Sequence, residues 1–257
     1  MNSKSIKILL SVFLIAMLFI SNAFSEDDGN RKSNTLNKPM GTPVRAYMNI
    51  NLVSTVIKNT GISDIDVAQA NSGLVYPRGS GKTAVFQSGL VWAAMLHNPA
   101  EFDPHVGGST YEEGLQGGWI TSTGAVTDPN DPRARIFRVR PDVYTGGPTV
   151  DLSPEATDEG RSEADVRAQY ETDWTEWPAD LGAPYFDGNT NGQYDSDPTS
   201  GDIPGVVGAN QTIWYVANDQ EIGLTNNLYG TAPMGMEMQA TFWAYAQTGA
   251  LGNMFFR

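Results

Sequence analysis

The chain contains no cysteine and only two histidines, His97 and His105. The absence of cysteine excludes disulfide bonds and a lipid-anchored N-terminal cysteine, but a chain of 257 residues can bury an adequate core without such cross-links. The two histidines do not follow a zinc-binding spacing such as H-E-x-x-H, so we expect both to be loop residues. No G-x-S-x-G sequence is present to form the nucleophile elbow of a hydrolase.

Positively charged residues are also scarce, with 16 lysines and arginines against 29 aspartates and glutamates and a net charge of −13. A chain this acidic is repelled by phosphate backbones and by anionic lipid surfaces, so we expect no nucleic-acid partner. The same composition suits an extracellular protein that binds cations.

Long apolar runs are absent apart from one at the N-terminus. Lys4 and Lys7 form a basic segment, residues 8–20 are almost wholly apolar, and residues 23–25 form a cleavage-type sequence. These features are typical of a secretory signal peptide over residues 1–25. The apolar run is shorter than the roughly 20 residues of a membrane-spanning helix. We expect cleavage to leave no membrane span and a net charge of −15, since two lysines are lost from a total of −13, and we expect the product to be secreted, either extracellular or at the cell surface.

The remainder of the chain is expected to form one domain behind a short linker. Residues 26–43 are polar, with Gly, Pro, Asn and Ser, and predict a flexible mature N-terminus. Over residues 44–257, runs rich in β-branched and aromatic residues are separated by turn sequences of Gly, Pro, Asn and Asp. This pattern predicts a mainly β fold, an antiparallel β-sandwich-like domain with one short helical insertion and long loops.

The sequence GSGKT at residues 79–83 is similar to the end of a phosphate-binding P-loop. That motif needs a glycine where this chain has Tyr76, and Pro77 removes a backbone donor inside the proposed cradle. The residues that follow, AVFQSGLVW, predict a strand rather than the required helix. We therefore expect no nucleotide partner, and a hairpin whose turn contains Gly79 and Gly81.

Four further segments have clear local patterns. Residues 136–140 (IFRVR) alternate apolar and basic residues and predict a strand with an exposed face. Residues 153–174 predict a helical segment that Gly160 divides in two. Residues 211–219 and 236–247 predict two strong strands, and the segment between them predicts a hairpin loop.

One loop has the spacing of a calcium site. Side-chain oxygens recur at positions 1, 3, 5 and 9 of this loop, and a backbone carbonyl falls at position 7. The residues concerned are Asp187, Asn189, Asn191, Gln193 and Asp195. A glycine falls at position 6, where the chain must turn sharply. Ca²⁺ prefers several hard oxygen ligands from one short loop, so the spacing predicts a metal site of this kind.

The loop departs from an EF-hand at position 12, where Pro198 replaces the bidentate glutamate, and Asp197 and Asp202 are the nearest substitutes. The pattern D-x-N-x-N-G-x-x-D resembles the calcium loops of dockerins and thrombospondin type 3 repeats. The resemblance implies a structural Ca²⁺ site of the weak extracellular grade, with a dissociation constant of about 10⁻⁴ to 10⁻³ M. A surface turn without metal is the alternative, because Asn, Asp and Gly dominate turns anyway.

Three segments together resemble the N-terminal region of large secreted surface proteins of Bacteroidota-type bacteria: YPRGSGKTAVFQSGLVW, DGNTNGQYDSDPTSGDIPGVVGANQTIWYVAND and TFWAYAQTGALGNMFFR. Such proteins often end in a type IX secretion sorting domain, which is not visible in this sequence. The resemblance covers most of residues 44–257 and supplies no catalytic residues. It implies that the chain is truncated at its C-terminus and that further domains of the same protein are its partners.

These observations favour a non-enzymatic secreted or cell-surface module, calcium-stabilised and part of a larger adhesion or surface protein. The alternative is the N-terminal domain of a secreted hydrolase of glycans or peptides, with catalytic residues elsewhere. Carboxylates are abundant, but no catalytic pair, such as Glu112 with Asp142, stands out. Trp174 and Trp177 suit either stacking on a sugar or packing at a helix end. The sequence does not identify a surface or glycan ligand.

Overall fold

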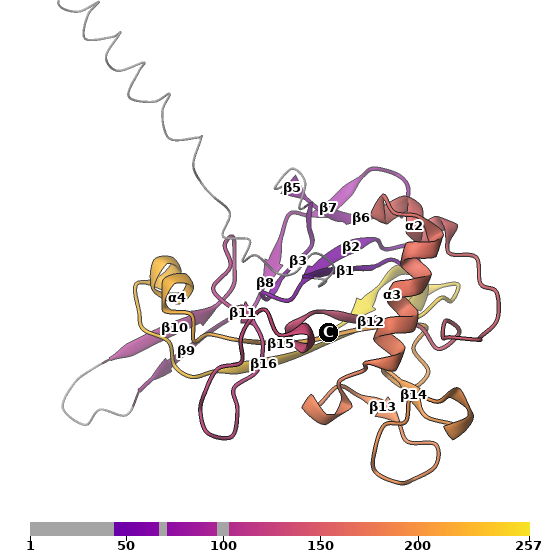
Figure 1. Cartoon of the computed structure of the whole chain (residues 1–257). Coiled ribbons are helices and arrows are strands. Elements are labelled where there is room, and N and C mark those ends of the chain that lie inside the picture. Colours follow the sequence, from indigo (N-terminus) through magenta and orange to yellow (C-terminus); the bar gives the residue numbers. More distant parts are fainter. Residues whose placement is uncertain (1–43, 67–70, 97–102) are drawn as a thin grey trace, which may run out of the picture. The chain divides into compact units, whose positions relative to one another are not determined.

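The structure is a computed structural model that describes residues 44–66, 71–96 and 103–257 (Figure 1). The predicted signal peptide, the predicted flexible segment after it and His97 lie outside the described residues. The chain divides into two units, Met1–Lys38 and Pro39–Arg257, and every described residue belongs to the second. In the described part of the chain, no helix has the length and apolar character needed to cross a bilayer.

Strands dominate the described residues, and they are joined by antiparallel pairing. In chain order the strands are β1 (Arg45–Met48), β2 (Thr55–Lys58), β3 (Ile62–Ser63), β4 (Ile65–Asp66), β5 (Asn71–Ser72), β6 (Leu74–Val75), β7 (Thr83–Val85), β8 (Ser88–Gly89), β9 (Val91–Met95), β10 (Pro104–Gly108), β11 (Gln116–Gly117), β12 (Phe137–Val139), β13 (Tyr185–Phe186), β14 (Ile203–Pro204), β15 (Gln211–Asn218), β16 (Glu237–Ala244) and β17 (Phe255–Phe256). The prediction of a mainly β fold is confirmed.

Helices are fewer among the described residues. The α-helices are α2 (Ser153–Glu159), α3 (Glu163–Thr175) and α4 (Ile222–Tyr229), and the 3₁₀ helices are η1 (Pro132–Ala134), η2 (Ala179–Leu181), η3 (Pro198–Ser200) and η4 (Ala250–Asn253).

The central strand is β15, which is buried along its whole length. It pairs with β16 on one side and with β11 and β12 on the other, within a five-stranded sheet that β17 extends beyond β16. Successive side chains of β15 point to opposite faces. Ile213 and Tyr215 pack in one hydrophobic cluster, and Trp214 and Val216 pack in another. The sheet is therefore covered on both faces, which explains why the strand reads as a nearly continuous apolar run.

A second, four-stranded sheet with the order β1-β2-β3-β8 supplies one of these covers. Ala46 and Met48 of β1 and Ile57 of β2 join the same cluster as Tyr215, and Phe242 of β16 stacks on the Tyr215 ring. Alternate residues of β16, namely Met238, Ala240, Phe242 and Ala244, face this cluster.

The GSGKT segment forms the predicted hairpin. Strands β6 and β7 pair on either side of it, and the backbone N–H of Tyr76 donates to the carbonyl of Lys82 (2.9 Å). Gly79 and Gly81 have φ of 77° and 67°, which glycine adopts readily and other residues do not. A strand, β7, follows the turn, as predicted, and no helix begins there.

The predicted helical segment is confirmed, including its division. Gly160 ends α2 in the left-handed conformation, with φ 62°, and its N–H donates to the carbonyls of the last turn. Ser162 then begins α3, and its hydroxyl oxygen accepts a hydrogen bond from the backbone N–H of Asp165.

The prediction that only a loop links β15 and β16 is wrong, because α4 lies between them. Glu221 caps the start of this helix by accepting from the N–H of Gly223, and Gly230 ends it with φ 71°. The eight residues include a glycine and two asparagines, which have low helix propensity. Tertiary hydrogen bonds compensate, since the Thr225 hydroxyl lies within 3.2 Å of the carbonyl of Gly114.

The prediction of an exposed basic face on residues 136–140 is also wrong. Arg138 and Arg140 are only 3% and 8% exposed, and Arg135 just before the strand is 4% exposed. We call these three residues the arginine cluster. Helix α3 packs across β12 (Figure 1), and the three arginines contact carboxylates of α2 and α3. A basic residue on a strand faces solvent only when nothing acidic covers it, and here two acidic helices do.

Each member of the arginine cluster is paired with a carboxylate from these helices. Arg135 contacts Asp173 and, at 3.1 Å, Glu176. Arg138 contacts Glu159 and donates to the carbonyl of Tyr47 (3.1 Å).

The third member, Arg140, contacts Glu155 of α2 and, at 2.7 Å, Asp142. The carboxylate of Glu155 also accepts a hydrogen bond from the Tyr170 hydroxyl. Burial raises the pKa of Tyr170 well above its usual value, so this hydroxyl keeps its proton and remains a donor.

Removing one partner of a buried pair leaves a desolvated charge behind, which costs about 3–5 kcal/mol. We therefore expect Asp173→Ala to lower the free energy of unfolding by about that amount, measured by urea denaturation. The carboxylate of Asp173 also accepts a hydrogen bond from the backbone N–H of Arg138 (2.8 Å). The substitution therefore leaves this buried N–H without its acceptor as well.

The control is Asp180→Ala, because Asp180 pairs with Arg133 on the surface and the two side chains are 68% and 45% exposed. This change should cost no more than about 1 kcal/mol. Equal effects of the two substitutions would show that the buried pair does not stabilise the fold.

Candidate functional site

The loop predicted to bind calcium is closed at its base by the fold. Strands β13 and β14 pair on either side of it. Asp202 is 1% exposed, and its carboxylate accepts from the backbone N–H groups of Gly188 and Asp195, both at 2.9 Å. A Cβ atom at Gly188 would lie 2.1 Å from the carbonyl oxygen of Gly201, so only glycine permits this close approach.

The side chains of the loop turn inward on its own backbone. The two carboxylate oxygens of Asp187 accept from the N–H groups of Asn191 (3.2 Å) and Gly192 (2.8 Å). The amide oxygen of Asn189 accepts from the N–H of Asn191 (3.0 Å), and that of Asn191 accepts from the N–H of Gln193 (2.7 Å). Gly192 has φ 78°, which makes the sharp turn at position 6.

The carboxylate of Asp195, the last predicted ligand, faces the side chains of Asn189 and Asn191. One oxygen of Asp195 is 2.9 Å from the side-chain nitrogens of both Asn189 and Asn191. The structure thus brings Asp187, Asn189, Asn191 and Asp195 together in one exposed loop, with the backbone of Gln193 beside them. All of these groups supply hard oxygens, the donors that Ca²⁺ prefers, so the residues present fit that ion.

Only two of these ligands are carboxylates. Within residues 44–66, 71–96 and 103–257, no group of three or more acidic, histidine or cysteine side chains gathers around one point. The two suggested substitutes for position 12 are engaged elsewhere. Asp197 caps η3 by accepting from the N–H of Thr199 (2.8 Å), and Asp202 closes the base of the loop. The donor set is that of a weak site.

Helix α3 fixes the loop in place. The hydroxyl of Tyr194 donates to the carbonyl of Trp174 (2.6 Å), and the indole N–H of Trp174 donates to the carbonyl of Ser196 (3.0 Å). The indole N–H of Trp177 donates to the carbonyl of Pro184 (2.9 Å). Trp174 and Trp177 are each 4% exposed, which confirms packing at the helix end and leaves neither ring free to stack on a sugar.

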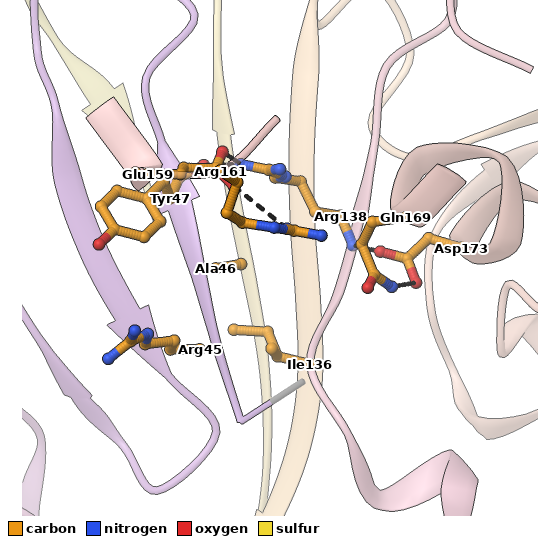
Figure 2. Close-up of a pocket in the computed structure, with 10 residues that line it drawn as sticks. Arg45, Ala46, Tyr47, Ile136, Arg138, Glu159, Arg161, Gln169 and Asp173 are labelled. Carbon is orange, nitrogen blue, oxygen red and sulfur yellow. Dashed lines mark hydrogen bonds and ion pairs between the residues drawn. The ribbon is translucent and has the colours of Figure 1, made fainter. Parts of the chain in front are cut away.

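A pocket of about 270 Å³ lies beside the arginine cluster (Figure 2). Its charged lining includes Arg138, Glu159 and Arg161, which Figure 2 shows joined by ion pairs. Burial alone would lower the pKa of Arg138, but its electrostatic interactions with the Tyr170 side chain and with the Glu159 carboxylate raise it above its usual value. Arg138 is therefore a permanent cation held by Glu159, and the pair acts as a structural support.

A larger and more open groove of about 450 Å³ shares Arg45 and Tyr47 with this pocket. Hydroxyl side chains and glycine backbone line much of it, including Gly79 and Gly81 of the GSGKT turn. The carboxylate of Asp158, at one wall, accepts from Arg78 (2.6 Å) and from the hydroxyl of Ser54 (3.1 Å). The groove is thus rich in hydrogen-bonding groups.

His105 is not a loop residue, contrary to the prediction. It lies in β10, is 7% exposed, and its ring nitrogens lie 2.8 Å from the carbonyl of Ala232 and 3.0 Å from the carboxylate of Asp103. Both neighbours are acceptors, so the doubly protonated ring satisfies both contacts. The carbonyl of Ala232 and the carboxylate of Asp103 raise the pKa of His105 above its usual value.

No protein-family model matches this chain, and no characterised protein or solved structure is significantly similar to it.

The side chains of the loop 187–202 were singled out from local spacing, but the pocket and the groove were not. Their residues come from β1, β2, β12 and the α2–α3 region, which are far apart in the sequence. One signal was present: three arginines within residues 135–140 precede a helical segment rich in carboxylates. The opposite charges of these two segments would have predicted that the helices pack against the strand.

The histidine predicts a pH dependence. Because the pKa of His105 is higher in the folded than in the unfolded chain, its stabilising contribution is complete below the unfolded value of about 6.5. The contribution is lost as the pH rises through the folded value. Urea unfolding between about pH 5 and pH 9 should show this loss in the parent chain and not in His105→Gln. The same pH dependence in both chains would contradict the assignment.

Proposed function

We propose that the chain is a secreted, non-enzymatic module of a larger surface or adhesion protein, and that Ca²⁺ bound in the loop 187–202 stabilises it. The observation that supports the proposal most directly is the arrangement of this loop. Oxygen-bearing side chains at positions 1, 3, 5 and 9 converge there around a left-handed glycine at position 6. A plain surface turn needs no such convergence.

The ion would be held by Asp187, Asn189, Asn191 and Asp195 together with the backbone carbonyl of Gln193. Its charge would offset the repulsion between the two carboxylates and cross-link the exposed part of the loop to its base. With two carboxylates, the dissociation constant falls in the range of about 10⁻⁴ to 10⁻³ M. Extracellular calcium concentrations suit such a site.

The ion pairs of the two carboxylates beside the pocket and the groove support a role other than catalysis. Glu159 is paired with Arg138 and Arg161, and Asp158 is paired with Arg78. Both carboxylates therefore hold neighbouring parts of the fold together, which favours a structural role for them. The groove lined by Tyr47 is the proposed recognition surface, since hydroxyls and glycine backbone suit a hydroxyl-rich ligand such as a glycan.

Calcium should raise the thermal stability of the chain. For the proposed affinity, about 10 mM Ca²⁺ stabilises the folded state by about 1.4–2.7 kcal/mol, which corresponds to a rise in Tm of about 3–10 °C. Asp187→Ala should abolish this rise, because it removes one of the two carboxylate ligands. Differential scanning calorimetry with and without Ca²⁺ measures the effect.

Asp180→Ala is the matched control, since it removes the same charge from an exposed position outside the loop. It should leave the calcium response intact, and Mg²⁺ at the same concentration should produce a smaller rise because it prefers a stricter octahedral geometry. If Asp187→Ala and the parent chain respond to Ca²⁺ alike, the loop is a surface turn.

A further inference from the structure

Strand β9 has one unpaired edge. It pairs with β10 along one side, and among the described residues no strand pairs with its other side. The side chains along it are apolar and largely exposed, with Val91 at 42% and Met95 at 51%. An edge of this kind presents free N–H and C=O groups, which are a template for another strand.

The hydrogen-bond pattern of the hairpin shows which backbone groups are free. The carbonyl of Leu90 accepts from the N–H of Ser109 (3.0 Å), so this pair is hydrogen-bonded. The N–H and C=O of Val106, opposite Ala93, instead contact the hydroxyl of Thr231 on the far side of β10 (3.2 and 3.0 Å). Because the pattern alternates along an antiparallel pair, the backbone N–H and C=O of Ala93 point to the free edge.

The same alternation places the free groups of Val91 and Met95 on that edge. It also shows that the two edges of the hairpin differ. Thr231 occupies the outer edge of β10, whereas the described residues place nothing comparable along β9. The open edge is therefore limited to β9.

Charge is missing from this edge. Residues 83–96 contain no Asp, Glu, Lys or Arg, in a chain whose net charge is −13. Proteins usually protect a free edge with lysine, proline or a bulge, and β9 has none of these. Two copies of so acidic a protein repel one another, and they can approach most closely where both lack charge.

We propose that two copies of this chain associate through β9, with the strands antiparallel about a two-fold axis at Ala93. In this register Ala93 faces Ala93 of the second copy, and the two residues exchange both of their backbone hydrogen bonds. Val91 faces Met95 of the second copy, and Trp92 faces Ala94. Every pair is apolar, and the largest side chain meets one of the smallest.

The strand sequence itself identifies the occupant as a second copy. An antiparallel self-pairing centred on Ala93 matches Leu90 with Leu96 as well, so the sequence LVWAAML is complementary to itself. Such an interface is isologous, and it uses the free β9 edge of both copies, so no open β9 edge remains. The paired hairpins form one continuous sheet in the order β10-β9-β9-β10.

Sedimentation velocity on the chain over a range of concentrations tests the association. We expect a monomer–dimer equilibrium, and Ala93→Pro should weaken the dimer by about 10- to 100-fold, because proline removes the central outward N–H in each copy. The β9–β10 ladder does not use that N–H, so the fold should survive. Circular dichroism and the Tm of the variant verify this.

A pair of double variants tests the register. Val91→Glu combined with Met95→Glu places like charges opposite each other and should dissociate the dimer. Val91→Lys combined with Met95→Glu changes the same positions but places opposite charges across the axis, so the dimer should persist. Both variants have exposed substitutions, and their monomers should unfold at similar temperatures.

A chain that stays monomeric at its highest soluble concentration would overturn the proposal. So would a dimer that these variants leave unchanged, or open-ended aggregates in place of a closed dimer. If β9 is instead paired by a strand from a different protein, the purified chain will be monomeric, which counts against self-association.

Discussion

Burial of the arginine cluster against the carboxylates of α2 and α3 is the interaction on which the rest of this structure depends. A guanidinium group can leave water only if a carboxylate accompanies it. The strand β12 therefore requires two acidic helices at this face, and the chain supplies them in the segment directly after the strand. A protein with only 16 basic residues thus places three of them inside, where each fixes the position of a helix.

The position of α3 in turn determines the position of the candidate calcium loop. Trp174, near the end of this helix, forms hydrogen bonds with Tyr194 and Ser196 of the loop. Asp202 closes the base of the loop by accepting from two of its backbone N–H groups. The ligands are gathered by hydrogen bonds within the protein, so a metal ion would complete an arrangement that the fold has already formed. The proposed Ca²⁺ ion would therefore meet oxygen donors that are already in place, although only two of them are carboxylates.

Local patterns in the sequence were sufficient to predict the features that depend on neighbours along the chain. These features are the strands β15 and β16, the turn at Gly79 and Gly81, the division of the helix at Gly160 and the gathering of the side chains in the loop 187–202. The burial of Arg138 was not predictable from alternation, because alternation does not show what covers a face. Helix α4 was missed for a similar reason, since tertiary hydrogen bonds outweigh its low propensity.

The central claim is that the fold forms the loop and that calcium completes it. Amide hydrogen exchange tests this most directly. The account predicts that the amides of Gly188 and Asp195, which donate to Asp202, are protected with or without Ca²⁺. The amides of Asn191 and Gly192, which donate to Asp187, should gain protection when Ca²⁺ is added. Exchange of all four amides at the rate of an unfolded peptide, unchanged by Ca²⁺, would contradict it.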